Sequence, residues 1–370
     1  MSTNPPPLTP PSEASRHHVA LRQAALAAHP ELARLQGANP WTALAIPVLL
    51  AIHWSVAAWV GASQSLLLCM VLAFFVGQWV IHAAGGLVHE TSHRLILRSR
   101  AGKLLVDLGL EWILASFARQ LTYQHEHVSS HHRYQGDYER DYEHEDLCAQ
   151  TARLAYTRQH PRRQRLVTLA TLALHSLPFG FLLSDWLMPR FYRAVTGRAV
   201  CDAARRIPAT RPTRQERRLF MATSLLSNLA LLSAFGWLGW LYHNWALSFF
   251  LGKMGVSNLG QSLSEHEGDD PDAPTRSTYG PVNLFLFNTG HHLEHHVFVN
   301  VPWNRLPALH RAAPEVFRHE NTRSYAWHWW RHVRADFSPS RRNALQGGDL
   351  SARCAAGPSA DVTATTTPRP

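Results

Sequence analysis

The chain has 370 residues and a formal net charge of +10; 46% of its residues are hydrophobic and 17% are charged. The apolar residues lie in long blocks flanked by arginines, which argues against a soluble two-domain protein and against a nucleic-acid-binding protein. The positive charge fits cytoplasmic loops beside anionic lipid, or a surface that binds an acidic electron carrier. The four cysteines form no Cys-x-x-Cys pair, so they imply neither a zinc ribbon nor an iron–sulfur cluster.

The two ends of the chain differ in composition from its middle. Residues 1–40 lack the charged-then-apolar order of a signal peptide and are expected to form a cytoplasmic segment. The start of this segment is Pro-rich, which predicts that it is disordered. Residues 337–370 are rich in Arg, Ala, Thr and Pro, which predicts a disordered tail. Residues 41–336 form the expected membrane domain.

Four apolar stretches are long enough to cross a membrane, because spanning a hydrocarbon core of about 30 Å takes about 20 residues. They cover Trp41–Ala62, Ser65–Gly85, Arg218–Tyr242 and Trp245–Leu263. The short gap within each pair of stretches predicts a hairpin. The sequence therefore predicts an all-α membrane protein with four transmembrane helices in two hairpins and a cytoplasmic helical cap.

Two further apolar stretches, Leu104–Phe117 and Leu166–Leu187, are interrupted by polar residues and are expected to lie at the membrane interface. Arginines crowd both flanks of the second stretch, and a full crossing there would place one basic flank outside the cell. Four spans with both termini in the cytoplasm avoid this, and they put the histidine clusters described next on one side.

Three histidine clusters stand out along this apolar chain. They read His89-Glu-Thr-Ser-His93, His127-Val-Ser-Ser-His131-His132 and His292-Leu-Glu-His295-His296, and a separate His266 follows Glu265. On a helix, residues three to five positions apart lie on one face or next to it, so each cluster can direct its imidazoles at a common centre. One zinc ion takes about four ligands, and this number of histidines therefore predicts two metal ions.

The first cluster has a competing interpretation. It matches the His-Glu-x-x-His pattern of zinc proteases, in which Glu90 would act as the general base. A zinc membrane protease or a zinc transporter is therefore a remote alternative, because it leaves the other two clusters without a role.

The surroundings of the third cluster carry a more specific signal. The runs are Tyr279-Gly280-Pro281-Val282-Asn283, Asn288-Thr289-Gly290-His291-His292-Leu293-Glu294-His295-His296 and Val301-Pro302-Trp303. With the first two clusters, they resemble the membrane fatty-acid desaturase and hydroxylase superfamily over about Val88–Leu309. The third part is most similar to the sphingolipid and acyl-lipid desaturase branch, where a Tyr-Gly-Pro-x-Asn run precedes Asn-x-Gly-Tyr-His-x-Glu-His-His.

The resemblance implies an O2-dependent oxidoreductase with two non-haem irons in its cytoplasmic cap, which desaturates a long acyl chain of a lipid or fatty acid. Neutral imidazoles suit Fe(II). The iron ligands that the resemblance implies are His89, His93, His127, His131, His132, His266, His292, His295 and His296.

Three departures from that branch leave a second function open. The second cluster has three residues before its His-His pair, where the branch usually has two, and with Glu126 it is similar to the box of alkane hydroxylases. His291 replaces the usual tyrosine, and Val297-Phe298-Val299 replaces the usual Asp-Phe-Pro. A di-iron hydroxylase, a monooxygenase of an alkyl or acyl chain, is therefore the alternative.

Other polar side chains near the clusters have weaker assignments. Carboxylates can orient the imidazole N–H groups of metal ligands. The candidates for that role are Glu90, Glu126, Asp137, Asp141 and Glu294. His82 lies about two turns too deep to be an obvious ligand, and His125 and His291 face away from their clusters. The histidines expected to be structural are His53, His144, His175 and His310.

The expected substrate lies partly in the bilayer, since the clusters cap helices with apolar walls. Leu104–Tyr123 is a hypothetical tunnel wall, in which enlarging Ala115 or Ala118 shifts the oxidised carbon. The chain carries no haem, flavin or dinucleotide motif, which implies a separate electron donor such as a ferredoxin, rubredoxin or cytochrome. Arginine greatly outnumbers lysine, which suggests a GC-rich bacterial genome and the inner membrane.

Overall fold

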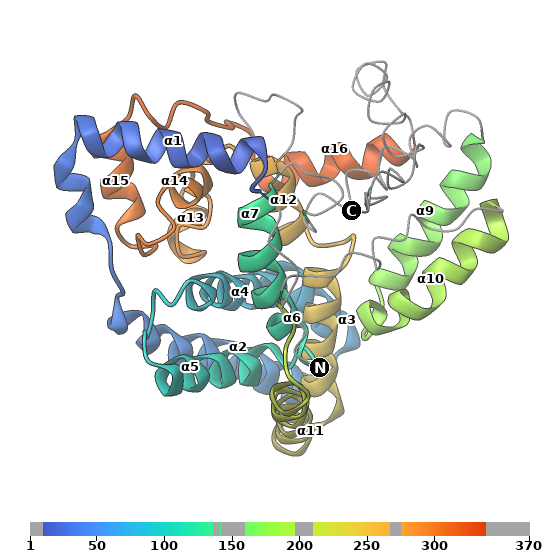
Figure 1. The fold of residues 1–370 in the computed structure, drawn as a ribbon. Coiled ribbons are helices and arrows are strands. Elements are labelled where there is room, and N and C mark those ends of the chain that lie inside the picture. Colours follow the sequence, from blue (N-terminus) through green and yellow to red (C-terminus); the bar gives the residue numbers. More distant parts are fainter. Residues whose placement is uncertain (1–9, 136–140, 142–159, 197–209, 267–274, 338–370) are drawn as a thin grey trace, which may run out of the picture.

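The computed structural model describes residues 10–135, 141, 160–196, 210–266 and 275–337. Within these ranges the chain is helical and contains no β-strand (Figure 1). Three of the described helices are long and apolar enough to cross a membrane: Pro40–Ser63, Leu66–Ser92 and Arg214–Leu251. The all-α membrane architecture is thus confirmed, whereas the count of four spans stays a prediction.

The first hairpin has the predicted position. Helix α2 (Ala45–Ser63) ends at Gln64, whose φ of 50° reverses the chain, and the Ser65 hydroxyl caps the next helix by accepting from the Leu68 N–H. The returning arm is continuous from α3 (Leu66–Leu72) through a π-helical turn, η3 (Ala73–Gly77), into α4 (Gln78–Ser92). Its far end carries the first histidine cluster.

The second hairpin turns at a different place from the predicted one. Helix α11 (Arg214–Leu251) contains Gly236 with φ 70° and ψ −175°, a conformation that is essentially restricted to glycine. The Asn228 side-chain oxygen accepts hydrogen bonds from Trp240 Nε1 at 2.9 Å and from Asn244 Nδ2 at 3.0 Å. Residues 16 positions apart on a straight helix would be about 24 Å apart, so the chain must reverse at Gly236.

The predicted turn between Tyr242 and Trp245 is therefore wrong. His243 and Asn244, the two polar residues there, are fully buried inside the second arm of α11. His243 Nδ1 lies 3.0 Å from His53 Nε2 on α2, so these polar side chains find partners inside the bundle. The predicted fourth span is also interrupted, because α11 ends at Leu251 and α12 (Asn258–His266) begins only after a turn.

Close glycine contacts bring the two hairpin turns together. A Cβ on Gly61, near the end of α2, would lie 2.1 Å from the Phe235 carbonyl oxygen, and a Cβ on Gly239 would lie 2.8 Å from that of Ala57. The turns at Gln64 and Gly236 therefore share one end of the bundle. The histidine-bearing end of α4 lies at the other end.

The remaining helices form the cap and its connections, except for η2, which begins the first candidate span. They are α1 (Glu13–Ala28), η1 (Pro30–Leu35), η2 (Pro40–Leu44), α5 (Arg100–Leu114), α6 (Arg119–Glu126), the π-helical η4 (His127–His131), α7 (His132–Tyr134), α9 (Pro161–His175), α10 (Gly180–Thr196), α13 (Val282–Phe285), α14 (His292–Val297), α15 (Leu306–Ala312) and α16 (Tyr325–Phe337). Helices α9 and α10 pack against each other, and neither they nor α5 belong to the candidate spans. In Figure 1, α1 lies across the cap beside α14 and α15.

The N-terminal segment packs on the cap. A buried apolar cluster joins Ala25 and Leu32 to Leu293 of the third histidine cluster and to Val297 and Phe298, which follow it. Its separation as a domain stays a prediction. The disorder expected at the chain start and in the tail falls on residues 1–9 and 338–370, which lie outside the described residues.

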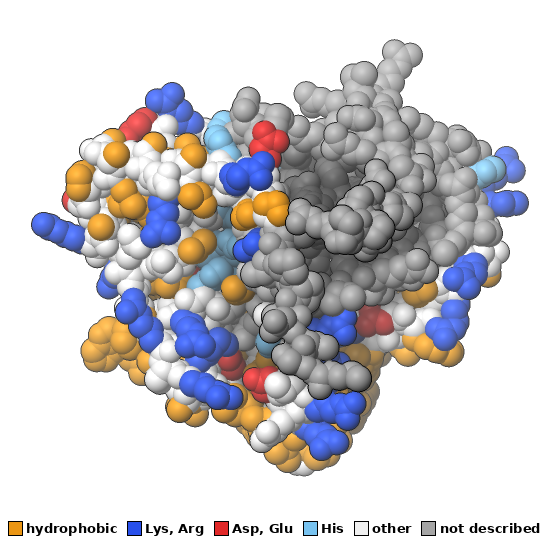
Figure 2. All heavy atoms as spheres, viewed as in Figure 1, with side chains coloured by type: hydrophobic (Ala, Val, Ile, Leu, Met, Phe, Trp, Pro, Cys, Tyr) orange, Lys and Arg blue, Asp and Glu red, His pale blue; other side chains and the backbone are white. Residues whose placement is uncertain are grey.

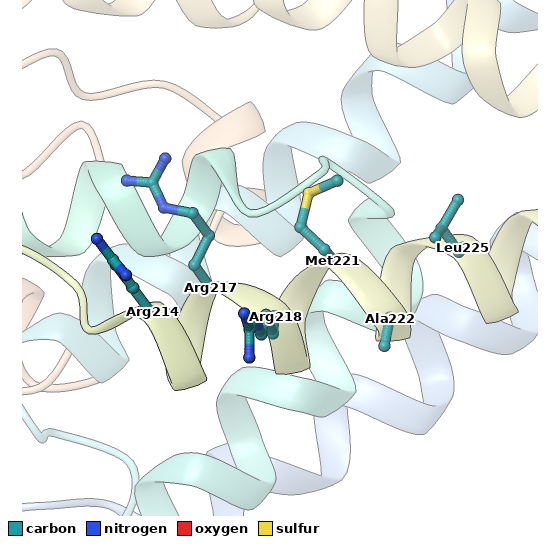
Figure 3. A pocket seen from close by; sticks show the side chains of 6 residues that line it. All are labelled: Arg214, Arg217, Arg218, Met221, Ala222 and Leu225. Atoms are coloured by element: carbon teal, nitrogen blue, oxygen red, sulfur yellow. The ribbon is translucent and has the colours of Figure 1, made fainter.

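The arginines that start α11 mark the edge of the apolar bundle. Arg214, Arg217 and Arg218 line a surface hollow of about 390 Å³ together with Met221 and Leu225 (Figure 3). Guanidinium groups above an apolar helix surface suit the level of lipid headgroups. The hollow is lined by no histidine and is separate from the clusters.

Candidate metal centre

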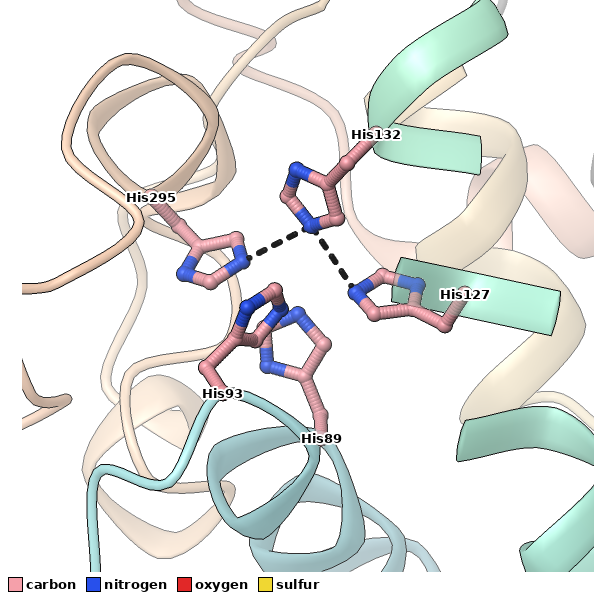
Figure 4. Close-up of side chains that lie close together, drawn as sticks. All are labelled: His89, His93, His127, His132 and His295. Carbon is pink, nitrogen blue, oxygen red and sulfur yellow. Dashed lines mark hydrogen bonds between the residues drawn. The ribbon is translucent and has the colours of Figure 1, made fainter. Parts of the chain in front are cut away.

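All nine histidines predicted from the sequence meet in the structure, in two groups. The first group has five members, His89, His93, His127, His132 and His295 (Figure 4), and the second has four, His131, His266, His292 and His296. In each group, one ligand atom from every member lies within 4.8 Å of the others. The groups draw on α4, η4, α7, α12 and α14, so the end of the first hairpin meets side chains from four other helices here.

The imidazole nitrogens converge on a common point in each group. In the group of five, His132 Nε2 lies 3.0 Å from His127 Nε2 and 3.2 Å from His295 Nε2. In the group of four, His292 Nε2 lies 2.9 Å from His266 Nε2 and 3.1 Å from His296 Nε2. Such a cluster of nitrogens is the donor set of a metal ion that prefers imidazole.

The number of hydrogen-bond donors and acceptors in the group of five favours a bound cation. A neutral imidazole has one nitrogen that donates and one that accepts, so five converging ring nitrogens cannot all satisfy one another. His89 Nε2 and His93 Nε2 are indeed buried without a hydrogen-bond partner. The residues present therefore fit a bound metal ion.

Burial favours the neutral form of six of these imidazoles. It lowers the pKa of His93 to about 3, and it lowers the pKa of His127, His132 and His295 well below the usual value of 6.5. The pKa values of His292 and His296 fall for the same reason, with further repulsion from neighbouring histidines. Neutral imidazole is the form that binds a metal.

A π-helical turn explains the unusual spacing of the second cluster. Residues His127–His131 form η4, so the cluster lies on a turn that contains one residue more than an α-helical turn. His127 and the fifth following residue, His132, thereby reach the group of five, while His131 reaches the group of four. The π-helical turn accommodates the one extra residue that this cluster has relative to the desaturase branch.

Carboxylates contact two imidazoles in the group of four. Asp141 Oδ1 lies 3.0 Å from His131 Nδ1, and both side chains are fully buried. Glu265 Oε2 lies 3.5 Å from His292 Nδ1, a contact that the sequence analysis did not assign. A carboxylate on Nδ1 holds the proton there and leaves Nε2 to face the metal.

The other candidate carboxylates have different roles. Glu90 accepts from the Trp303 N–H at 3.2 Å, so it ties α4 to the loop after α14. Glu126 is half-buried, and Asp137 lies outside the described residues.

Glu294 holds α14 to neighbouring segments and contacts residues outside the two groups of histidines. It accepts from the Ser277 hydroxyl and from the Tyr279 hydroxyl, each at 2.6 Å, and lies 2.7 Å from His310 Nδ1. Burial alone would raise the pKa of Glu294, but hydrogen bonds from His291, His310 and Ser277 hold it at about 2. His310 is thus structural, as predicted, and its pKa is raised by the hydrogen bond to Glu294.

The remaining described histidines lie outside both groups. His82 is buried on α4, His125 contacts Thr210, and His175 accepts from the Lys253 N–H at 2.7 Å. His144 lies outside the described residues. Ala115 and Ala118, the hypothetical tunnel residues, are buried at the α5–α6 connection, where the Ala118 N–H donates to Glu111.

The structure adds one histidine that sequence reasoning missed. His18 on α1 is only 4% exposed, and its ring centroid lies 5.3 Å from that of His296. No local signal could have indicated it, because its neighbours in sequence carry no metal-ligand spacing. Only the packing of α1 on α14 brings it to the group of four.

Comparisons with known proteins point in one direction. A profile of the family described as fatty acid desaturase matches residues 65–329. A "sphingolipid delta(4)-desaturase DES1-like" protein of Arabidopsis thaliana is 26% identical over 308 residues, which cover 83% of this chain and 81% of the relative. The "sphingolipid delta(4)-desaturase DES1" of Drosophila melanogaster is 29% identical over 320 residues, 81% of this chain and 83% of the relative. A human "sphingolipid delta(4)-desaturase/C4-monooxygenase DES2" is 40% identical over 73 residues, 20% and 22% of the two chains.

Proposed function

The chain belongs to the fatty acid desaturase family, and we therefore propose that it uses O2 and two irons, held by the nine histidines, to desaturate a long acyl chain of a lipid. The enzyme is an oxidoreductase, as its family indicates. The observation that carries the proposal is the meeting of three sequence-distant clusters in two compact groups. A single hydrolytic zinc would leave one of these groups without a role.

The two groups would each hold one iron. The group of five would bind through α4, η4, α7 and α14, and the group of four through η4, α12 and α14. When bound, the irons would supply the oxidising power, through O2, that removal of hydrogen from an unactivated CH2 group requires. Asp141 and Glu265 would keep the Nδ1 protons of His131 and His292 in place.

The membrane placement supports a lipid substrate. One candidate span, Leu66–Ser92, ends at the two groups of histidines, so an acyl chain in the bilayer can reach them. The relatives' names place their reaction at the fourth carbon, and we propose that this enzyme also oxidises a carbon near the polar end of its lipid. Electrons would come from a separate ferredoxin, rubredoxin or cytochrome, and the site would face the cytoplasm of a bacterium from the inner membrane.

Hydroxylation is the second candidate. One relative's name combines desaturase with C4-monooxygenase, and the second cluster has the spacing of alkane hydroxylases. Both reactions begin by removing one hydrogen from the chain. Desaturation then removes a second hydrogen, whereas hydroxylation adds oxygen at the same carbon.

Metal content and product analysis test the proposal. The detergent-purified chain, expressed with ample iron and zinc, is expected to contain about two irons, and host lipids are expected to gain double bonds. New hydroxyl groups in place of double bonds would select the hydroxylase. One zinc without iron would contradict both candidates.

A further inference from the structure

A cavity opens beside the metal centre on the side that α1 covers. Its volume is about 900 Å³, and among its walls are His132 from the group of five and His296 from the group of four. In Figure 2, histidine side chains are visible on this face below α1, with arginines around them. A molecule in this cavity would therefore lie against both groups.

The cavity is positively charged and has a polar inner end. Arg16, Arg22 and Arg133 line it, and none of its described lining residues is acidic. Arg16 donates one hydrogen bond to the Pro11 carbonyl, and Arg22 donates one to Gln36 Oε1. Each guanidinium has five N–H donors, so each retains donors for another acceptor. At the inner end, His18 Nε2 is buried without a hydrogen-bond partner.

The other walls are apolar and are held in place. Val19, Val128, Val297 and Val299 line the cavity, so it suits alkyl carbons next to a polar group. The α1 wall is fixed to the metal-bearing segment, because the Ser15 hydroxyl donates to the His132 carbonyl at 2.8 Å.

We propose that this cavity binds the anionic headgroup of the lipid substrate, with Arg16 and Arg22 contacting a phosphate or carboxylate. The inference rests on the proposed function, and it names the class of lipid. A headgroup held beside His132 and His296 places the first carbons of its chain at the metal centre. The cavity would thereby determine that the oxidised carbon lies near the polar end.

Binding of soluble probes to the full-length, iron-loaded protein tests the inference. Octyl phosphate is expected to bind at least about tenfold more tightly than octanol, which lacks the charge, and than inorganic phosphate, which lacks the chain. Equilibrium dialysis measures all three. Equal binding of octyl phosphate and octanol would overturn the inference, and so would equal binding of inorganic phosphate, which would mark a site for free anions.

Two pairs of variants localise the binding. Arg22→Gln is expected to weaken octyl phosphate about tenfold and to leave octanol unchanged, while Arg34→Gln, an exposed arginine on η1 outside the cavity, changes neither. Ala20→Trp fills the cavity and is expected to reduce binding of both alkyl probes, whereas Ala27→Trp on the exposed side of α1 is not. Unchanged binding in Arg22→Gln and Ala20→Trp would overturn the inference.

The iron content of each preparation separates the two proposals. With about two irons per chain and no preference for octyl phosphate, the headgroup inference fails while the proposed function stands. With zinc or no metal in the wild type, the proposed function itself fails.

Discussion

At the scale of single residues, a histidine inside one of the two groups should affect metal content when it is replaced, and His266 is one example. His266→Ala removes one of four donors from the smaller group. We expect iron to fall from about two per chain to at most one, with loss of activity, because the smaller group would keep only three of its four imidazole donors. Elemental mass spectrometry and product analysis measure both.

A control for this variant is His125→Ala. His125 lies outside both groups and contacts Thr210 instead. It should retain its iron and activity. Full retention of both by His266→Ala would remove His266 from the ligand set.

Asp141 tests the role of buried carboxylates around the centre. Asp141→Asn keeps the shape of the side chain but removes the charge that faces His131 Nδ1. We expect metal affinity to fall about 10- to 100-fold, because the carboxylate raises the basicity of the imidazole. A chelator competition measures this affinity, and Asp185→Asn, at an exposed aspartate paired with Arg119, should leave it unchanged.

At the scale of elements, the π-helical turn η4 can be tested by deletion. Removing Ser129 restores two residues before the His-His pair, and an α-helical turn would then present the histidines in similar directions. We expect this variant to retain about two irons. Removing both Val128 and Ser129 should turn His131 and His132 away from their groups and lose the metal.

The turn at Gly236 is a second element that a substitution can test. A Cβ there would meet no atom within 4 Å, so Gly236→Ala isolates the cost of the backbone conformation. We expect the free energy of unfolding to fall by about 1–3 kcal/mol, because the position has a φ of 70°. Thermal unfolding in detergent measures the loss; an unchanged melting temperature would place the turn elsewhere.

The sequence predicted the local parts of this architecture and missed those that depend on packing. The nine histidines were recognisable because each cluster lies within a few positions on one helix. The division into five and four was not, because it depends on where α12 and α14 cross η4. The Gly236 turn was hidden within a continuous apolar run, and the polar pair His243 and Asn244 suggested a turn although both are buried.

At the scale of the whole molecule, the metal centre joins segments that the chain brings from far apart. The groups connect α4, η4, α12 and α14, so a bound metal would stabilise the cap as well as supply chemistry. Removing the metal with a chelator is expected to lower the melting temperature and to increase amide hydrogen exchange in α14 and η4. Exchange in α2, which provides no ligand, should change little.

Two pairs of adjacent residues divide between the groups, and this links the occupancies of the two sites. His131 and His132 follow one another in the chain, as do His295 and His296. In each pair, one imidazole belongs to the group of five and the other to the group of four. Ordering one site therefore also orders two members of the other, so binding of the first ion reduces the conformational entropy that binding of the second must remove. Titration of the metal-free chain with Fe(II) should therefore be sigmoidal, and forms with a single iron should be scarce at half saturation.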